Sequence, residues 1–280
     1  MRGGIDSIVQ KELRITLSWY VRNTLTSVSY LHRNWQDEHR CDLCGAASVD
    51  IPPKIAMPRQ WQTDSRSPPR SPRPHSPISL VWKQHFPMQQ SWISIFDDVS
   101  QLIALDRAFA EMQLEAAVTS GSWMEPTVFR LLSIRPLKQG NDREYVMEEV
   151  CRLGMLLFLS PIWRFMGSSP VWTFAFTRNL FSVLNTHLLE WNDLRPLLIW
   201  AVYFAAIETS DIVERNSFIH MLAQLMKGSG LIGWEELMRV VKGVLWVEKV
   251  FANSENLVRE EVMGIIASYD MEHLGESQDV

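Results

Sequence analysis

The chain has few cysteines and no long hydrophobic run, and each absence excludes a class of protein. Three cysteines in 280 residues cannot form a disulfide framework, which favours a reducing compartment. The longest apolar runs, 154–163 and 196–207, fall short of the roughly 20 residues that a membrane-spanning helix needs. Charged residues interrupt the apolar ones over 1–20, so no secretory signal is predicted. The sequence therefore predicts a soluble, intracellular protein.

Motifs of the common enzyme classes are also missing. There is no glycine-rich phosphate loop, no G-x-S-x-G elbow, no HExxH motif and no dinucleotide-binding fingerprint. His187 and His220 stand among apolar neighbours, where a core or boundary position explains a histidine better than catalysis does. Capping and solvation of helix ends explain the acidic residues near predicted turns, namely Glu208, Asp211, Glu214, Glu235 and Glu236. We therefore expect no enzyme, and no catalytic, cofactor-binding or metal-binding residue.

Cys41 and Cys44 form a CxxC pair, the local shape that presents two thiolates to one metal ion. A tetrahedral zinc site takes four ligands, and no second CxxC or HxxxH pair follows. His32 and His39 lie close enough in sequence to complete a site, but their spacing matches no known zinc module. Two unpaired thiols are the preferred interpretation, and metal binding by this pair stays open.

Charge and composition divide the chain near residue 79. Residues 1–78 carry 11 Lys and Arg against 7 Asp and Glu, whereas residues 79–280 carry 16 against 25. An acidic body is a poor electrostatic match for a phosphate backbone, so any direct contact with nucleic acid is expected in the N-terminal part. Residues 1–49 are predicted as an N-terminal extension, poorly ordered, in which 7–35 has the spacing of an amphipathic helix.

Residues 50–78 differ in kind, because they are dense in proline, serine and arginine. Such a composition buries too little apolar surface to offset the entropy of ordering, so it predicts a disordered linker. Three Ser-Pro steps lie in this segment, at Ser67, Ser71 and Ser76. A solvated spacer is the preferred interpretation, and proline-directed phosphorylation that offsets local positive charge is the alternative.

Residues 79–270 have helical periodicity almost throughout, and no stretch alternates long enough to predict a strand. The clearest part is 194–251, where three apolar runs are joined by short polar turns. Pro196 suits the first turn of the first of these helices, and Gly233 precedes the last of the three. Helices are expected over 91–110, 125–132, 141 to Pro161 (which kinks or ends the helix), 171–190, 194–209, 213–227, 234–252 and 257–269.

The fold predicted for 79–270 is all-α, an irregular multi-helix bundle, followed by a frayed tail over 271–280. Twelve tryptophans are a high number, and most must be packed inside the protein. Core packing explains Trp200, Trp234 and Trp246 without a ligand pocket. Cys151 lies on a predicted apolar helix face and is interpreted as an ordinary core residue.

Three segments resemble the fungal-specific transcription factor domain, the all-helical regulatory region of zinc-binuclear-cluster regulators. They are VCRLGMLLFLSPIWRFMG (150–167), LRPLLIWAVYFAAIETSD (194–211) and the block from Asn216 to Phe251 that includes GWEELMRVVKGVLW. The resemblance implies a nuclear regulatory domain without catalysis or cofactor, whose partners are other proteins, as a homodimer or heterodimer or in the transcription machinery, or a small effector. Its motifs are apolar, so they name no ligand, target gene or oligomeric state.

The chain departs from that family in its cysteines. A zinc binuclear cluster needs six cysteines within a basic stretch, and only Cys41 and Cys44 lie in the N-terminal part. Direct DNA binding is therefore not expected without a zinc cluster, and either the N-terminus is a truncated or misjoined gene model or the protein regulates through partners. An all-helical adaptor unrelated to transcription is the main alternative, and a helical enzyme with a buried pocket is the weaker one.

Overall fold

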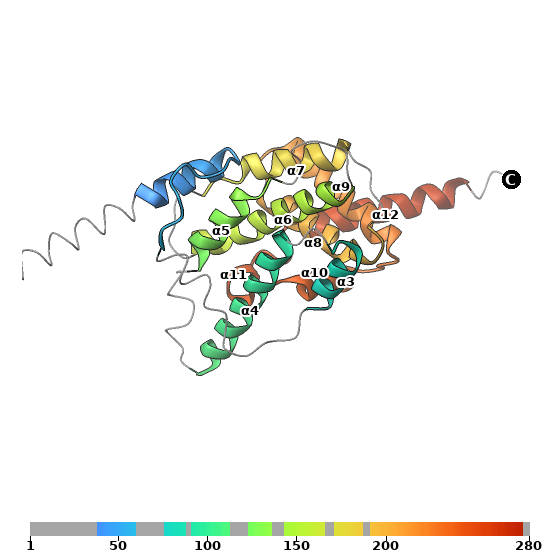
Figure 1. The fold of residues 1–280 in the computed structure, drawn as a ribbon. Helices are drawn as coiled ribbons and strands as arrows, with labels where there is room; N and C mark the ends of the chain where they lie inside the picture. Colours follow the sequence, from blue (N-terminus) through green and yellow to red (C-terminus); the bar gives the residue numbers. More distant parts are fainter. Residues whose placement is uncertain are drawn as a thin grey trace, which may run out of the picture. The chain divides into compact units, whose positions relative to one another are not determined.

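A computed structural model describes residues 38–59, 76–87, 91–112, 123–135, 143–165, 171–186 and 191–276 (Figure 1). Every regular element in these ranges is a helix, and none of them contains a strand, which confirms the all-α prediction. The chain divides into two units, Met1–Asp42 and Leu43–Val280, and the description below concerns the second. The predicted helix over 7–35, together with His32, Ser67, Ser71 and His187, lies outside the described residues.

The helices of the second unit follow one another in the order of Figure 1. A helical segment ends at residue 48 before the first labelled helix. The labelled elements are α3 (Pro77–His85), α4 (Ser91–Met112), α5 (Met124–Ser133), α6 (Arg143–Phe165), α7 (Phe174–Thr186), the 3₁₀ turn η1 (Asn192–Leu194), α8 (Arg195–Glu208), α9 (Ile212–Gly228), α10 (Trp234–Val244), α11 (Glu248–Phe251) and α12 (Arg259–Glu276).

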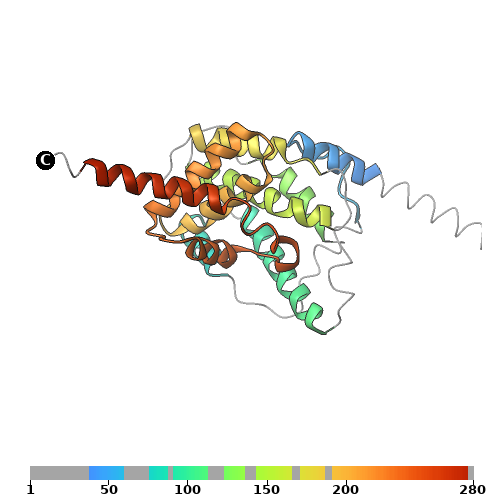
Figure 2. The same ribbon diagram turned by 180° about the vertical axis from the view of Figure 1, so that it is seen from behind.

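The centre of the unit is α8, which is buried on every side from Leu197 to Ala206. The helices α6, α9 and α10 pack against it, and α12, the dark red helix of Figure 2, lies along α9. Pro196 stands in the first turn of α8, as the sequence predicts, where its missing N–H leaves no hydrogen bond unmade. A helix without a polar face must be covered by other elements on all sides, and these neighbouring helices cover α8.

Aromatic rings fill the space around α8. Trp200 is fully buried, and its Nε1 donates a hydrogen bond to the carbonyl oxygen of Leu245 at 3.1 Å. The rings of Phe158 and Phe204 have their centres 5.1 Å apart, in an edge-to-face arrangement. Trp234 and Trp246 are 3% and 4% exposed. The prediction that Trp200, Trp234 and Trp246 are core residues is confirmed.

The structure decides two helix boundaries inside the bundle. Of the two alternatives predicted for Pro161, a kink or an end, the end is excluded, because α6 continues past it to Phe165. A proline in the last turn removes one hydrogen bond, and the buried side chains around it, Ile162 and Trp163, hold the turn in place. The helix predicted over 234–252 is two helices, separated by extended backbone at residues 245–247.

This interruption has a physical cause in the side chains that it buries. Leu245 and Trp246 are 5% and 4% exposed, and Leu245 has the dihedral angles of a strand, with φ −149° and ψ 136°. Successive side chains of extended backbone point to opposite sides, so both residues can reach the core. The carbonyl group of Leu245, which a continuous helix would use internally, accepts the hydrogen bond from Trp200 instead.

The packed unit also extends further along the chain than the sequence predicts. Leu43, Ala46 and Ala47 belong to the buried core, although they fall in the segment predicted as an N-terminal extension. At the other boundary, α3 begins at Pro77 with Ser76 as its N-cap, before the predicted domain start at residue 79. The last helix continues to Glu276 rather than ending near 269. This packing is made by a few apolar residues that lie within otherwise polar segments. The average composition of such a segment does not reveal them.

Candidate functional site

A group of charged side chains lies inside the helical unit, and we call it the Asp50 cluster. Its members are Asp50, Arg135, Glu149, Arg152 and Asn179. The side chain of Arg152 is 1% exposed and lies between two carboxylates. Its Nη1 and Nη2 donate to the two oxygens of Asp50, each at 2.9 Å. Its Nε and Nη2 donate to Glu149 at 2.6 Å, so the guanidinium is bound in bidentate fashion on both sides.

The side chain of Asp50 is only 4% exposed and joins four parts of the chain. Besides Arg152, it accepts a hydrogen bond from Nδ2 of Asn179 on α7 at 2.8 Å. Arg135, two residues after the end of α5, has its Nη1 3.7 Å from Oδ1 of Asp50 and donates to the backbone oxygen of Asp50 at 3.2 Å. The cluster therefore connects the turn after residue 48 with α5, α6 and α7.

Local structure explains how these residues meet. Glu149 and Arg152 are three residues apart on α6, a spacing that places them on the same helix face. Asp50 has a φ of 52°, the left-handed conformation that aspartate adopts more readily than most residues. This conformation closes the turn, where the backbone N–H of Asp50 donates to Ala47 at 3.3 Å and that of Ile51 donates to Ala46 at 3.0 Å.

The charges of the Asp50 cluster balance, with two carboxylates against two guanidinium groups. Burial alone lowers the pKa of Arg152, but its hydrogen bonds to Glu149 and Asp50 outweigh this and raise the pKa above its usual value. Burial and the nearby charge of Arg152 lower the pKa of Arg135. Each carboxylate is already held by a guanidinium group. The arrangement therefore ties helices together and offers no uncommitted acid or base for catalysis.

Glu148, next to this cluster in sequence, caps the N-terminus of α4, although Glu148 itself belongs to α6. Its Oε1 accepts a hydrogen bond from the backbone N–H of Trp92 at 3.1 Å, in the first turn of α4. Burial raises the pKa of Glu148, the hydrogen bond from Trp92 opposes this shift, and the charge of Glu149 adds to it. A carboxylate on α6 thus supplies the cap that α4 needs for its first N–H groups.

Sequence reasoning did not find the Asp50 cluster. One signal was present, since Glu149 and Arg152 interrupt an otherwise apolar run, and a helix buried there must pair them. No such signal marks Asp50, because it stands at the start of a polar, proline-rich segment. Its burial depends on a backbone turn and on two residues, Arg135 and Asn179, that are distant in sequence.

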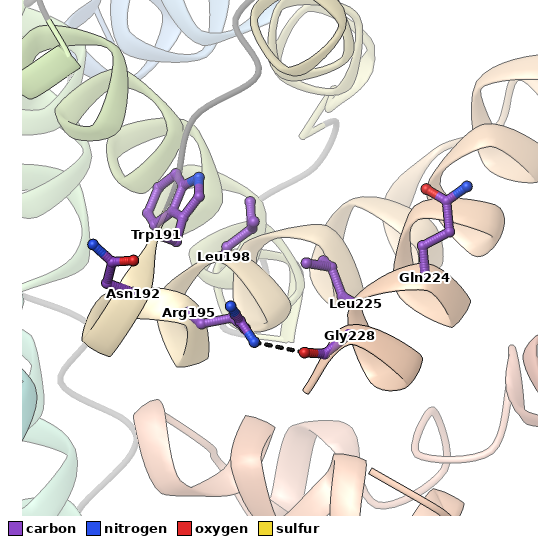
Figure 3. Close-up of a pocket in the computed structure, with 7 residues that line it drawn as sticks. All are labelled: Trp191, Asn192, Arg195, Leu198, Gln224, Leu225 and Gly228. Atoms are coloured by element: carbon purple, nitrogen blue, oxygen red, sulfur yellow. Dashed lines mark hydrogen bonds between the residues drawn. The ribbon is translucent and has the colours of Figure 1, made fainter. Parts of the chain in front are cut away.

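A surface groove of about 480 Å³ lies where α8 begins and α9 ends (Figure 3). Arg195 extends across it, and its Nη1 donates to the carbonyl oxygen of Gly228 at 2.7 Å, which caps the last turn of α9. Arg195 has no ion-pair partner among the described residues. The groove is lined by Trp191, Asn192, Arg195, Leu198, Gln224, Leu225 and Gly228.

The chemistry of this groove suits a small polar molecule. The guanidinium of Arg195 keeps N–H groups beyond the one bound to Gly228 and offers them to an oxygen atom. Asn192 and Gln224 add exposed amides, and Leu198 and Leu225 add an apolar wall. These groups line a groove at the surface, so a small molecule reaches them without entering the core.

Two of the acidic residues assigned to helix ends act there as predicted, whereas Glu208 neither caps nor solvates a helix end, because its side chain is 9% exposed and forms an ion pair with Arg164. Oδ1 of Asp211 accepts hydrogen bonds from the backbone of Val213 and Glu214 at 2.9 and 3.0 Å and caps α9. Glu236 accepts the backbone N–H of Ile232 at 2.8 Å, which closes the turn before α10. Both capping roles are confirmed.

The remaining candidates are scattered rather than gathered into a site. Cys41 is exposed and Cys151 is buried, as the core prediction requires, and the three cysteines form no disulfide. His220 is exposed on α9, so its predicted core or boundary position is wrong. No group of three or more His, Cys, Asp or Glu side chains in the described ranges has the geometry of a metal site. Among the described helices, none is long and apolar enough to cross a membrane.

Comparisons of the chain with protein-family models, with curated proteins and with solved structures found no match.

Proposed function

We propose that the protein is a non-catalytic regulatory protein of the nucleus that acts in transcription regulation. It does so by binding other proteins or a small effector, without a zinc-cluster module of its own. Residues 1–280 hold three cysteines, half of what a binuclear zinc cluster needs. In this proposal DNA is reached through a partner protein.

One observation carries this proposal. The three segments that resemble the fungal regulatory domain, 150–167, 194–211 and 216–251, correspond to α6 from Val150 onward, to α8, and to α9 through α11. In the structure α6 and α9 both pack on α8, and α10 packs on α8 as well. The segments therefore form one continuous core, which supports interpreting their likeness as that of a whole domain. A fold alone does not define a function, so the proposal needs a functional test.

The chemistry of the buried charges supports the non-catalytic part of the proposal. The guanidinium of Arg152 is hydrogen-bonded to the carboxylates of Asp50 and Glu149, and the carboxylate of Glu148 accepts a hydrogen bond from the start of α4. The groove at Arg195 has polar groups to hold a ligand, and among the described residues no carboxylate or imidazole lines it to act as a general acid or base. Binding without turnover is the behaviour that this arrangement supports.

A tethering experiment tests the proposal. The full chain is fused to an unrelated DNA-binding domain, and a reporter gene with the matching operator is measured. We expect a change of several-fold in either direction relative to the DNA-binding domain alone, and none with a reporter that lacks the operator. An unchanged reporter at equal protein level, together with a tagged chain that stays outside the nucleus, would contradict the proposal and favour a helical adaptor.

Direct DNA binding is tested separately with the purified chain. We expect no site-selective shift of DNA fragments, because residues 79–280 carry a net negative charge of nine. A site-selective, salt-sensitive shift at low protein concentration would contradict the absence of a DNA-reading surface.

A further inference from the structure

The groove between the start of α8 and the end of α9 contains hydrogen-bonding groups that the fold does not use. Arg195 donates one N–H group to the carbonyl oxygen of Gly228, at 2.7 Å (Figure 3). The side-chain amides of Asn192 and Gln224 are exposed and have no hydrogen-bond partner among the described residues. These groups are available to a bound molecule without the loss of a contact within the protein.

The bond to Gly228 leaves one edge of the Arg195 guanidinium open. A guanidinium carries five N–H groups in one plane, and this bond occupies one of the two on Nη1. The parallel N–H groups of Nε and Nη2 match the spacing of two carboxylate oxygens. Arg152 of this chain binds in this way, because its Nε and Nη2 donate to Glu149 at 2.6 Å. The same edge of Arg195 has no carboxylate partner among the described residues.

The two helix ends at the groove also favour negative charge. The 14-residue helix α8 begins at Arg195, and its N-cap, Leu194, supplies no side-chain hydrogen bond. The positive end of the α8 dipole therefore has no side-chain cap. The C-terminal end of a helix is negative, but the last four carbonyl groups of α9, those of residues 225–228, all accept hydrogen bonds. The groove is therefore positive on balance.

Charged side chains next to the groove are directed to other partners. The carboxylate of Asp193 lies 3.6 Å from Nε2 of His85 on α3. The ammonium group of Lys227 lies over the ring of Tyr269, 5.4 Å from its centre. Of the described residues that line the groove, Arg195 alone carries a charge. One positive charge matches a single carboxylate, whereas a phosphate group carries nearly two negative charges and takes more donors than this groove offers.

Apolar side chains form the rest of the groove. Leu198 and Trp191 are 9% and 5% exposed, and Leu225 is half-buried. A hydrocarbon chain or ring that covers these side chains is removed from water together with them. The volume of about 480 Å³ falls within the roughly 300–1,000 Å³ that small-molecule sites occupy. A matching ligand therefore has an apolar body beside its carboxylate.

We propose that the groove at Arg195 is the binding site of a small organic acid with one carboxylate and an apolar body. In the complex, Nε and Nη2 of Arg195 donate to the two carboxylate oxygens. The apolar body lies against Leu198 and Leu225, and the amides of Asn192 and Gln224 add hydrogen bonds at the rim. This inference rests on the effector-binding part of the proposed function and names the chemical class of that effector.

The test titrates the purified full chain with 3-phenylpropionate and measures binding by ligand-observed saturation-transfer NMR. We expect a dissociation constant of about 1 mM or below, as suits a ligand of this size. Two analogues identify the recognised group, since 3-phenylpropan-1-ol lacks the carboxylate and inorganic phosphate lacks the apolar body. Both should bind at least tenfold more weakly. Equal binding of the alcohol or of phosphate would overturn the assignment of a monocarboxylate.

Arg195→Lys tests the planar pair of donors. Lysine keeps the positive charge and a donor for Gly228, but it has no parallel N–H groups, so 3-phenylpropionate should bind at least fivefold more weakly. Arg239→Lys is the matched control, because Arg239 is exposed on α10 and does not line the groove. This control should leave the dissociation constant within twofold of the wild type. Circular dichroism melting curves of both variants verify that the helices are intact.

Gln224→Glu places a negative charge in the groove on an exposed position of α9, where the fold tolerates it. Repulsion of the carboxylate should weaken binding at least tenfold. Asn216→Asp is the matched control, because it adds the same charge to an exposed position of α9, eight residues or about 12 Å before Gln224. It should change the dissociation constant by less than twofold.

The proposal and the proposed function fail in different ways. Binding of 3-phenylpropionate that neither Arg195→Lys nor Gln224→Glu weakens would overturn the site, and so would a wild-type chain that does not bind the acid. If such a chain still changes the tethered reporter, the carboxylate site alone is refuted. A chain that binds the acid in the groove and leaves the reporter unchanged refutes the proposed function alone.

Discussion

Gly154 of α6 packs directly against Ala201 of α8, with no room for a side chain between the two central helices. A Cβ atom placed on Gly154 would lie 2.7 Å from Cβ of Ala201 and 3.2 Å from its Cα. The space between residue 154 and Ala201 is too small for a Cβ atom on residue 154. The packing of α6 on α8 therefore depends on a glycine at position 154.

We expect Gly154→Ala to lower the free energy of unfolding by about 1–3 kcal/mol, because the added methyl group overpacks the contact with Ala201. Urea denaturation of the purified variant measures the change. Gly264→Ala is the matched control, since Gly264 lies inside α12 with nothing within 4 Å of its would-be Cβ. That control should gain up to about 1 kcal/mol from helix propensity. A stabilised Gly154→Ala variant would show that the two helices can separate without loss.

Arg152→Met is expected to lower the free energy of unfolding by about 3–5 kcal/mol, since it leaves Asp50 and Glu149 buried without their cation. Chemical denaturation again gives the value. Arg239 is exposed on α10, so Arg239→Met removes a positive charge without breaking a buried pair and should change stability by less than about 0.5 kcal/mol. Equal effects of the two substitutions would mean that the Asp50 cluster contributes nothing to the fold.

The raised pKa of Glu148 predicts a pH dependence whose sign is fixed. Because the folded state holds this proton more tightly than the unfolded chain, the carboxyl destabilises the fold increasingly as the pH rises above its ordinary value of 4.5. Glu148→Gln removes this ionisation and keeps an oxygen that accepts from Trp92. The stability of the variant relative to the wild type should therefore increase between pH 4 and pH 7 in urea titrations. A difference that falls over this range would refute the assignment.

The cysteines should differ widely in reactivity. Burial, with a smaller contribution from the charge of Glu148, raises the pKa of the Cys151 thiol well above its usual value. Since the thiolate is the reactive form, Cys151 should resist iodoacetamide in the native protein and react only after unfolding. Cys41 is exposed and should be modified first. Peptide mapping by mass spectrometry follows both sites, and early labelling of Cys151 would show that the core opens locally.

The sequence predicts the helices of this protein well because their signals are local. Apolar spacing locates α8 and α9, and the Asp211 side chain caps α9 where a polar turn was expected. Local signals failed where tertiary contacts decide the backbone. Residues 245–247 have a helical pattern, yet burial of Leu245 and Trp246 on two sides makes the extended form more stable.

The candidate sites were harder to predict than the helices. The Asp50 cluster joins residues up to 129 positions apart, as in the bond from Asn179 to Asp50. The groove at Arg195 arises only when the start of α8 and the end of α9 lie together.

The burial of α8 on all sides has a consequence for how the chain reaches its fold. During synthesis α6 and α7 leave the ribosome before α8, whereas α9 and α10 follow it. For that interval the segment from Leu197 to Ala206 has only part of its final surroundings and exposes a continuous hydrophobic surface. Aggregation or chaperone capture at this stage competes with folding, so truncations that end between residues 208 and 244 should accumulate as insoluble protein.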